Sequence, residues 1–226
     1  HIVVIDNNSK NLASLKESTN SKRISIIETD VRDLETIKTN LDFHKDKLSK
    51  LKSIVVNAGK HKFHLEQGAS SWQEIIDINL TGAYNLTMAS LDYLKKSKSD
   101  KKSIVYLSSA ASKYPVPEAL PYAVSKAGLE SLMRNVAAML AKRVICVNAV
   151  APGWVDTPMM RSVIKKAAFS RKLDPKEIEL SFKNHSLLRR ISSTGEIAEI
   201  VFFLLYSKQS SITGQVLRTD NGIITE

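Results

Sequence analysis

The stretch Ile104-Val105-Tyr106-Leu107-Ser108-Ser109 is a short apolar run that ends in two hydroxyl side chains. A short apolar run bounded by turn residues is typical of a strand that is buried on both faces. A helical pattern follows at 121–140, with apolar side chains three and four residues apart, and another apolar run follows at 144–147. Strand, helix and strand in this order predict a crossover unit of a parallel sheet.

The rest of the chain repeats this alternation in both directions. Further strand-like runs lie at 2–5, 24–27, 53–56 and 215–218. Further helical patterns lie at 9–17, 34–48 and 72–94, and a capping pattern at 193–196 predicts the start of another helix. We therefore predict an α/β fold with a Rossmann-like, doubly wound parallel sheet and helices on both faces. The chain has no repeat or interdomain linker, so residues 1–226 are predicted to form a single domain.

The composition excludes several classes of protein. Hydrophobic residues make up 43% of the chain, but no apolar run approaches the roughly 18 residues that a membrane span requires. The net charge of +10 comes from lysine-rich connectors without base-stacking motifs, which indicates a solvated surface and not a nucleic-acid site. The single cysteine, Cys146, fits a reducing compartment. We expect a cytoplasmic protein with neither a membrane nor a nucleic acid as its partner.

Tyr122 and Lys126 stand four residues apart in a helical segment, so both side chains lie on one face. A cation near a phenol lowers its pKa, which lets the phenol exchange a proton with an alcohol or a carbonyl group near neutral pH. The pair alone is also common on ordinary helix surfaces. Ser109 strengthens the interpretation, because it ends a predicted strand and the carboxyl ends of parallel strands form the ligand crevice of an open α/β sheet.

The spacing of these residues resembles the short-chain dehydrogenase/reductase family. That family places a catalytic serine at a strand end thirteen residues before the catalytic tyrosine, the same interval as from Ser109 to Tyr122. Matching motifs follow in order over essentially the whole chain: Asp30-Val31, Asn57-Ala58-Gly59, Ile78-Asn79-Leu80-Thr81-Gly82 and Pro152-Gly153-Trp154-Val155-Asp156-Thr157. The resemblance implies an NAD(P)-dependent oxidoreductase that interconverts a secondary alcohol and a ketone by hydride transfer. The small-molecule substrate stays open among simple alcohols and ketones, sugars, steroids and oxoacyl thioesters.

The resemblance implies catalytic roles for four residues. Tyr122 would be the general acid/base, and Lys126 would lower its pKa and bind the nicotinamide ribose. Ser109 would hold the substrate oxygen, and Asn79 would support a water-linked proton relay through Lys126. On their own, Ser109 is typical of a strand-end turn, and Asn79 fits a polar residue that kinks or hydrates a long helix.

The resemblance also assigns the residues that bind the cofactor. These are Asp30 and Val31 beside the adenine, Asn57, Ala58 and Gly59 where the cofactor approaches the sheet, Pro152, Val155 and Thr157 at the nicotinamide carboxamide, and Tyr122 and Lys126. Asp6 ends the run 2–5, where a carboxylate can accept hydrogen bonds from both ribose hydroxyls and would repel a 2′-phosphate. We therefore expect NAD in preference to NADP. A cap on the following helix is the alternative role of Asp6.

The chain departs from the family's pattern at its start. The family begins with a strand, a Thr-Gly-x-x-x-Gly-x-Gly turn and a helix whose N-terminus faces the pyrophosphate, whereas the earliest glycine here is Gly59. The first β-α unit, about 30 residues long, is thus missing, and its strand would lie between those that end at Asp6 and Asn57. We expect an N-terminally incomplete domain. A catalytically inactive scaffold or binding protein is the alternative, which the missing phosphate-binding loop favours.

Three weaker signals concern partners and ligands. Residues 158–190 correspond to the family's substrate-binding region, and their basic side chains would attract an acidic substrate or carrier, although solvated helix faces explain them more simply. The segment 72–94 is apolar on more than one face, which predicts a homo-oligomer, either a dimer or a tetramer. His61 and His64 lack further ligands nearby, so no metal site is predicted. Trp154 either lines the substrate pocket or packs behind the cofactor.

Overall fold

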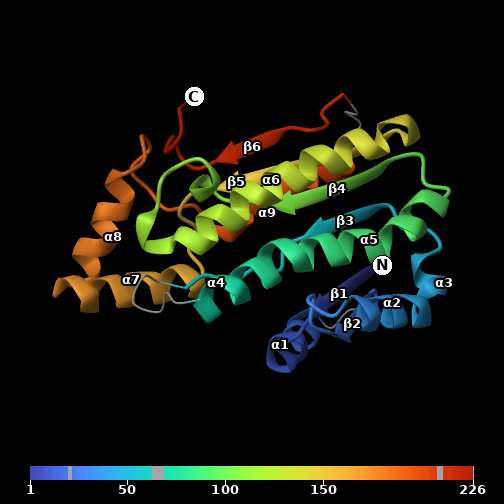
Figure 1. The fold of residues 1–226 in the computed structure, drawn as a ribbon, viewed down its shortest axis with the longest axis horizontal. Helices are drawn as coiled ribbons and strands as arrows, with labels where there is room; N and C mark the ends of the chain where they lie inside the picture. The colour runs from blue at the N-terminus through green and yellow to red at the C-terminus, as the bar shows by residue number, and fades with distance from the viewer. Residues whose placement is uncertain (20–21, 63–68, 208–210, 226) are drawn as a thin grey trace.

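The computed structural model describes residues 1–19, 22–62, 69–207 and 211–225, which form an α/β fold (Figure 1). Its strands are β1 Ile2–Asp6, β2 Ile24–Glu28, β3 Ser53–Val56, β4 Lys102–Leu107, β5 Ile145–Pro152 and β6 Val216–Thr219. Strands β3, β4, β5 and β6 lie side by side in that order, β1 pairs with β2, and every pairing is parallel. The predicted parallel α/β architecture is confirmed.

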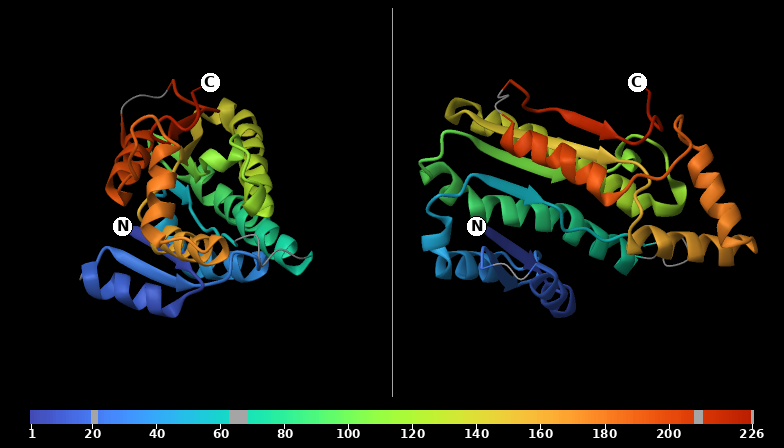
Figure 2. Two further views of the ribbon diagram at one scale, coloured as in Figure 1. Left: turned by 90° about the vertical axis from the view of Figure 1, so that its left-hand side faces the viewer. Right: turned by 180° about the vertical axis from the view of Figure 1, so that it is seen from behind.

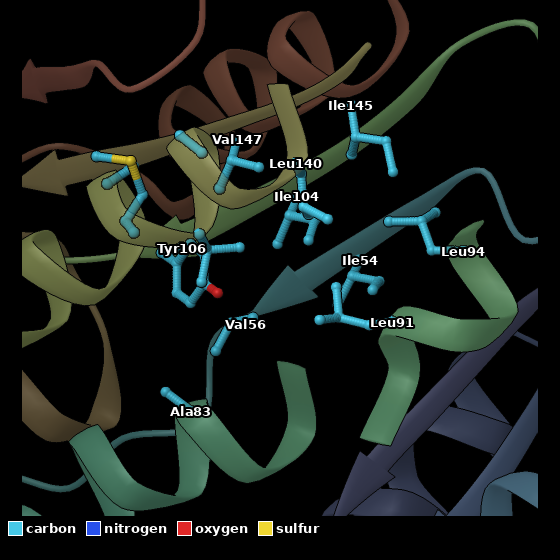
Figure 3. Close-up of a cluster of buried hydrophobic side chains, with 14 of the residues drawn as sticks. Ile54, Val56, Ala83, Leu91, Leu94, Ile104, Tyr106, Leu140, Ile145 and Val147 are labelled. Atoms are coloured by element: carbon cyan, nitrogen blue, oxygen red, sulfur yellow. The ribbon is translucent and has the colours of Figure 1, made fainter. Parts of the chain in front are cut away.

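Helices cover both faces of the four-stranded sheet. Helices α5 Gly82–Lys96 and α6 Leu120–Leu140 lie on one face, and α9 Thr194–Tyr206 lies on the other, as the front and rear views show (Figures 1 and 2). Strand β4 packs against both layers because its side chains alternate. Ile104 and Tyr106 belong to the core beneath α5 and α6 (Figure 3), while Val105 packs with Leu204 of α9.

The sheet is divided between β1 and β3, which are not paired with each other in the described part of the chain. The division lies where the resemblance expects one further strand. Packing of helices joins the two parts: Ile37 and Leu41 of α2 Leu34–Phe43 form a buried cluster against Leu86 of α5. Asn85 of α5 also donates hydrogen bonds of 3.1 Å to two backbone carbonyl oxygens that follow β2.

Two predicted helices are interrupted. The segment 34–48 forms α2 and the short α3 Lys45–Leu48, with His44 between them. The segment 72–94 forms α4 Ala69–Ile76, a π-helical turn at Asp77–Thr81 and then α5. The first described helix, α1 Ser9–Thr19, and α9 with its capping box of Ser193 and Glu196 agree with prediction. Among the described helices, none is long and apolar enough to cross a membrane.

Residues 158–190 form two helices at the carboxyl end of the sheet, α7 Pro158–Arg171 and α8 Pro175–Asn184 (Figure 1). Each helix begins at a proline that follows a capping residue, Thr157 and Asp174. Their apolar side chains pack mainly on one another. The periodicity of this region is weak because neither helix presents a wide apolar face to the sheet.

Candidate active site

A cavity of about 960 Å³ opens where strands β3, β4 and β5 end. Its described lining includes Ser109, Tyr122 and Lys126 of the predicted catalytic set. It also includes the predicted cofactor residues Asn57, Gly59, Pro152, Val155 and Thr157. The structure therefore brings together residues from four separate predicted motifs at the carboxyl edge of the sheet, the usual place for a ligand in this architecture.

Helix α6 places Tyr122 and Lys126 one turn apart, facing the end of β4. The Lys126 Nζ atom lies 5.6 Å from the centre of the Tyr122 ring and donates a 2.7 Å hydrogen bond to the carbonyl oxygen of Leu107, the last residue of β4. Ser109 follows two residues later, and its Oγ accepts a 3.2 Å hydrogen bond from the backbone N–H of Ala111. The lysine thus ties the helix to the strand end that carries the serine.

Burial is the largest influence on both titratable groups. It raises the pKa of Tyr122, and a hydrogen bond between the Tyr122 and Ser109 side chains opposes this shift. It lowers the pKa of Lys126 to about 8, because the ammonium group of a residue that is only 4% exposed has lost most of its solvation. The charge of Lys126 is therefore not the main influence on Tyr122 here, and its expected role in lowering that pKa stays a prediction.

Asn79 lies in the π-helical turn and is fully buried. Its Nδ2 donates to the backbone oxygen of Lys60 (3.0 Å) and to Ser125 Oγ (2.9 Å), while its Oδ1 accepts from the backbone N–H of Lys60 (2.7 Å). Ser125 Oγ in turn donates to the Tyr122 carbonyl oxygen at 2.7 Å. Asn79 thus joins the loop after β3 to Ser125 in the second turn of α6. π turns inside helices are frequent at functional sites.

Replacing Asn79 with alanine should destabilise the protein by about 1–3 kcal/mol, because buried polar groups of Lys60 and Ser125 would lose their partner. Urea unfolding measures this loss. Asn135→Ala is the matched control, since Asn135 is exposed and donates only to a carbonyl oxygen of its own helix. Equal stability of the Asn79 and Asn135 variants would contradict a structural role of Asn79 between the loop and α6.

Gly59 lies close to the side chains of Lys126 and Asn79. A Cβ atom at this position would lie 3.5 Å from Lys126 Nζ and 3.6 Å from Asn79 Oδ1. Both polar atoms therefore border the space that the missing side chain leaves open at the cavity. This geometry supports the expectation that the backbone at Gly59 can be approached closely.

The loop after Gly59 is held on α4 by charge. Lys60 and Lys62 bind opposite oxygens of Glu74 at 2.5 and 2.7 Å, and these contacts lower the pKa of Glu74 to about 2. His61 between them lines the cavity and contacts the Tyr122 ring edge-on, with ring centres 5.0 Å apart. His64 lies outside the described residues. No three His, Cys, Asp or Glu side chains in the described ranges gather into a possible metal site.

The residues expected at the adenine end lie apart from the cavity. Asp6, Asp30 and Val31 are not among the described residues that line it, and neither is Ala58 of the Asn57-Ala58-Gly59 motif. Asp6 is instead the last residue of β1, and Asp30 follows the paired strand β2 at the same edge of the two-stranded sheet. Asp6 Oδ1 accepts a 2.9 Å hydrogen bond from the backbone N–H of Asn8. The Asn8 side chain in turn accepts a 3.1 Å hydrogen bond from the backbone N–H of Asn11, in the first turn of α1. Asn8, and not Asp6, therefore caps α1.

The turn after β2 is fixed by close packing and by an ion pair. Arg32 binds both carboxylate oxygens of Asp30, the shortest contact being 2.6 Å, and holds the pKa of Asp30 below its usual value. Val31 is buried beneath Gly82, where an added Cβ would lie 2.5 Å from Val31 Cγ2. Gly82 is therefore required for α5 to approach this turn.

The opposite wall of the cavity comes from residues near α7 and α8. Trp154 lines the cavity and stacks on Phe182 of α8, with ring centres 4.0 Å apart and planes nearly parallel. Of the basic residues noted in 158–190, Arg171 is the one among the described lining residues, and it pairs with Glu118 at 3.4 Å. Met160 and Val163 add apolar surface. This wall suits an apolar substituent better than a strongly acidic one.

Known proteins resemble this chain over most of its length. The family model described as enoyl-(acyl carrier protein) reductase matches residues 1–224. A 3-oxoacyl-[acyl-carrier-protein] reductase, FabG, from Thermotoga maritima is 33% identical over 196 residues, which are 86% of this chain and 74% of that protein. The oxidoreductase UcpA from Salmonella typhimurium is 30% identical over 88% of this chain and 75% of its own length.

Solved structures of a dehydrogenase and a ketoreductase also resemble this chain. Carveol dehydrogenase from Mycobacterium avium in complex with NAD is 27% identical and superposes with a TM-score of 0.88 over 98% of this chain and 87% of that one. A variant of actinorhodin polyketide ketoreductase with NADPH is 26% identical, with a TM-score of 0.89 over 98% and 86%. The chain belongs to the short-chain dehydrogenase/reductase family. Within it, the protein is an NAD(P)-dependent oxidoreductase.

Sequence reasoning missed two residues that the fold brings to the site. Ser125 lies three residues after Tyr122, the spacing at which a helical hydroxyl reaches a preceding carbonyl, and this signal was available. His61 had no usable signal, because its contact with Tyr122 joins segments that are far apart in the chain. His61 lies in the loop after β3, half-buried, and its ring packs against Tyr122.

Proposed function

We propose that this protein interconverts a secondary alcohol and a ketone, with Tyr122 as the general acid/base. The observation that carries the proposal is the arrangement of Ser109, Tyr122 and Lys126 around one cavity at the carboxyl edge of the sheet. A ketone oxygen placed between Ser109 and Tyr122 can accept hydrogen bonds from both hydroxyls. Tyr122 then donates its proton to that oxygen as the carbonyl is reduced.

The cavity fits the nicotinamide end of the cofactor. Lys126 can bind the ribose hydroxyls from within the cavity, Gly59 leaves backbone accessible, and Pro152 and Val155 border the same space. The bound nicotinamide supplies or accepts the hydride. Asn79 and Lys126 would support the return of a proton to Tyr122, since Asn79 Oδ1 and Lys126 Nζ border the same open position at Gly59.

A 3-oxoacyl thioester is our preferred substrate class. The Thermotoga relative bears the name of a reductase for such a compound, and the apolar wall formed by Val163, Trp154 and Phe182 fits an acyl chain. The test is oxidation of NADH and NADPH by the purified protein with a 3-oxobutanoyl thioester and with simple ketones, sugars and steroids. Turnover supports an enzyme. Cofactor binding without turnover of any of these substrates would favour the binding-protein alternative.

We propose NAD as the preferred cofactor because Asp6 ends β1, at the edge of the two-stranded sheet where Asp30 follows β2 by two residues. Asp6→Ser should weaken NADH binding by roughly tenfold, as expected from losing one or two hydrogen bonds to a carboxylate, and should improve NADPH binding. Glu28→Ser is the control, because Glu28 pairs with Asp6 in register but precedes the turn. Tighter binding of NADPH than of NADH by the unaltered protein would overturn the preference.

A homo-oligomer is our proposal for the assembly. Tyr84 of α5 and Val124 and Met139 of α6 leave 47%, 41% and 51% of their surface exposed on the helices that cover one face. Burial of such side chains against a second copy would be favourable. The mass in solution measures the assembly. A cytoplasmic location stays a prediction from the sequence.

A further inference from the structure

Helix α6 carries a third polar residue in line with the catalytic pair. Glu130 follows Lys126 by four residues, as Lys126 follows Tyr122, so the three side chains share one face of the helix. Glu130 is only 6% exposed, and the neighbouring Leu129 and Met133 belong to the hydrophobic core. A buried carboxylate among apolar residues is costly unless its oxygens are hydrogen-bonded or paired.

The Glu130 carboxylate binds both sides of the loop that holds Ser109. Its Oε1 accepts a 2.9 Å hydrogen bond from Ser108 Oγ and also contacts the hydroxyl of Ser112. Ser112 Oγ lies 2.7 Å from the Ser109 carbonyl oxygen as well, so its one proton is shared between two acceptors. Ser108 directly precedes Ser109 and Ser112 ends the short 3₁₀ turn Ala110–Ser112, so Glu130 contacts the loop on both sides of Ser109.

The second carboxylate oxygen faces positive charge. Glu130 Oε2 lies 3.7 Å from Arg218 of β6 and 3.9 Å from Arg134 on the next turn of α6. The Arg218 side chain is 21% exposed, whereas that of Arg134 is 53% exposed. Because the more buried arginine interacts in the less polar surroundings, Arg218 contributes more to holding the carboxylate in place.

We infer that Glu130 is a positioning residue, which anchors the loop 108–112 to α6 and so sets the Ser109 hydroxyl against Tyr122. This inference rests on the proposed function, because it assigns Glu130 an effect on catalysis through Ser109. Tyr122 and Lys126 are carried by α6 itself, whereas Ser109 belongs to the loop. Without the anchor, the serine can move relative to the tyrosine while the fold persists.

Kinetics of Glu130 variants test the inference. Glu130→Ala should lower kcat by roughly 10- to 100-fold, since a displacement of about 1 Å at a catalytic group has effects of this size. Glu130→Gln should retain most of the turnover, because its amide oxygen can still accept from Ser108 and Ser112. Arg134→Gln is the matched control, expected to leave kcat nearly unchanged. A Glu130→Ala variant that is folded and fully active would overturn the inference.

A double-mutant cycle separates positioning from a general loss of structure. In a Ser109→Ala background, Glu130→Ala should cost little further turnover, because the group through which it acts is already absent. The pair Ser108→Ala with Ser112→Ala removes the same anchor from the loop side and replaces Glu130→Ala in the cycle if that variant does not fold. If the losses of turnover in the two single variants, expressed as free energies, simply add in the double variant, the inference would be overturned. If Ser109→Ala alone leaves turnover unchanged, the proposed function fails instead.

Discussion

Tyr122→Phe should lower kcat by roughly 100- to 10 000-fold, the range expected when a general acid/base is removed. The substitution deletes one hydroxyl and keeps the ring that packs edge-on with His61. It also leaves Lys126 bound to the Leu107 carbonyl oxygen, so the binding of the cofactor should change little. The measurement is a comparison of kcat, substrate KM and cofactor Kd between the variant and the unaltered protein.

Tyr114→Phe is the control for this experiment. Tyr114 also lines the cavity and is 39% exposed, but it lies outside the Ser109, Tyr122 and Lys126 arrangement. Its variant should keep kcat within a small factor of the original value. Undiminished kcat in Tyr122→Phe, or equal losses in both variants, would contradict the assignment of Tyr122 as the acid/base.

Lys126→Met should lower turnover by at least roughly 100-fold, because it removes the cation beside the proposed acid/base and the expected ribose contact.

Burial lowers the pKa of Lys126 to about 8, whereas an unfolded lysine titrates near about 10.4. Between these two values the unfolded chain binds more protons than the folded one. Lys126 should therefore contribute a rise in stability with pH across this window, by an amount on the order of 3 kcal/mol.

The slope of stability against pH is the test of this second prediction. Below about pH 8 the burial of a charged lysine opposes folding in full, and above about pH 10.4 the penalty has gone. Lys126→Met abolishes the slope, although it also leaves the Leu107 carbonyl oxygen without a donor. Urea unfolding at several pH values measures it, with the exposed Lys96→Met as control. A slope that persists in Lys126→Met would show that another group causes it.

Much of the fold was predictable because burial leaves a strong pattern in the sequence. Strand β4 is buried on both faces, so Ile104, Val105 and Tyr106 form a continuous apolar run that marks it without ambiguity. The start of α9 was equally clear, since the capping box of Ser193 and Glu196 depends on residues within one turn. Local interactions of this kind are visible in the sequence.

Tertiary interactions explain what was missed. The π turn at Asn79 accompanies hydrogen bonds to the Lys60 backbone and to Ser125, which are distant in sequence, so a continuous helix was the natural prediction. Helices α7 and α8 pack chiefly on each other, which weakened the periodicity of residues 158–190. In the candidate site, spacing predicted Tyr122 and Lys126, which the structure places at one cavity, whereas the contact of His61 with Tyr122 depends on the fold.

The division of the sheet also separates the two ends of the expected cofactor site. Asp6 and Asp30 follow strands of the two-stranded sheet, whereas Asn57 and Pro152 line the cavity of the four-stranded sheet. Sequence motifs predicted residues at both ends of the cofactor site, but they contain no information on the distance between the two ends. The proposed preference for NAD therefore depends on Asp6 of the two-stranded sheet, whereas the proposed chemistry depends on residues that line the cavity.

Isotope transfer tests the central claim most directly. NAD(P)H that carries deuterium at the transferred position of the nicotinamide is supplied together with the substrate that the protein turns over, and the alcohol product is examined by mass spectrometry. We predict that the deuterium appears on the former carbonyl carbon, and that Tyr122→Phe forms this product at a rate lower by roughly 100-fold or more. An unlabelled alcohol, or labelled product formed equally fast by Tyr122→Phe, would contradict the account.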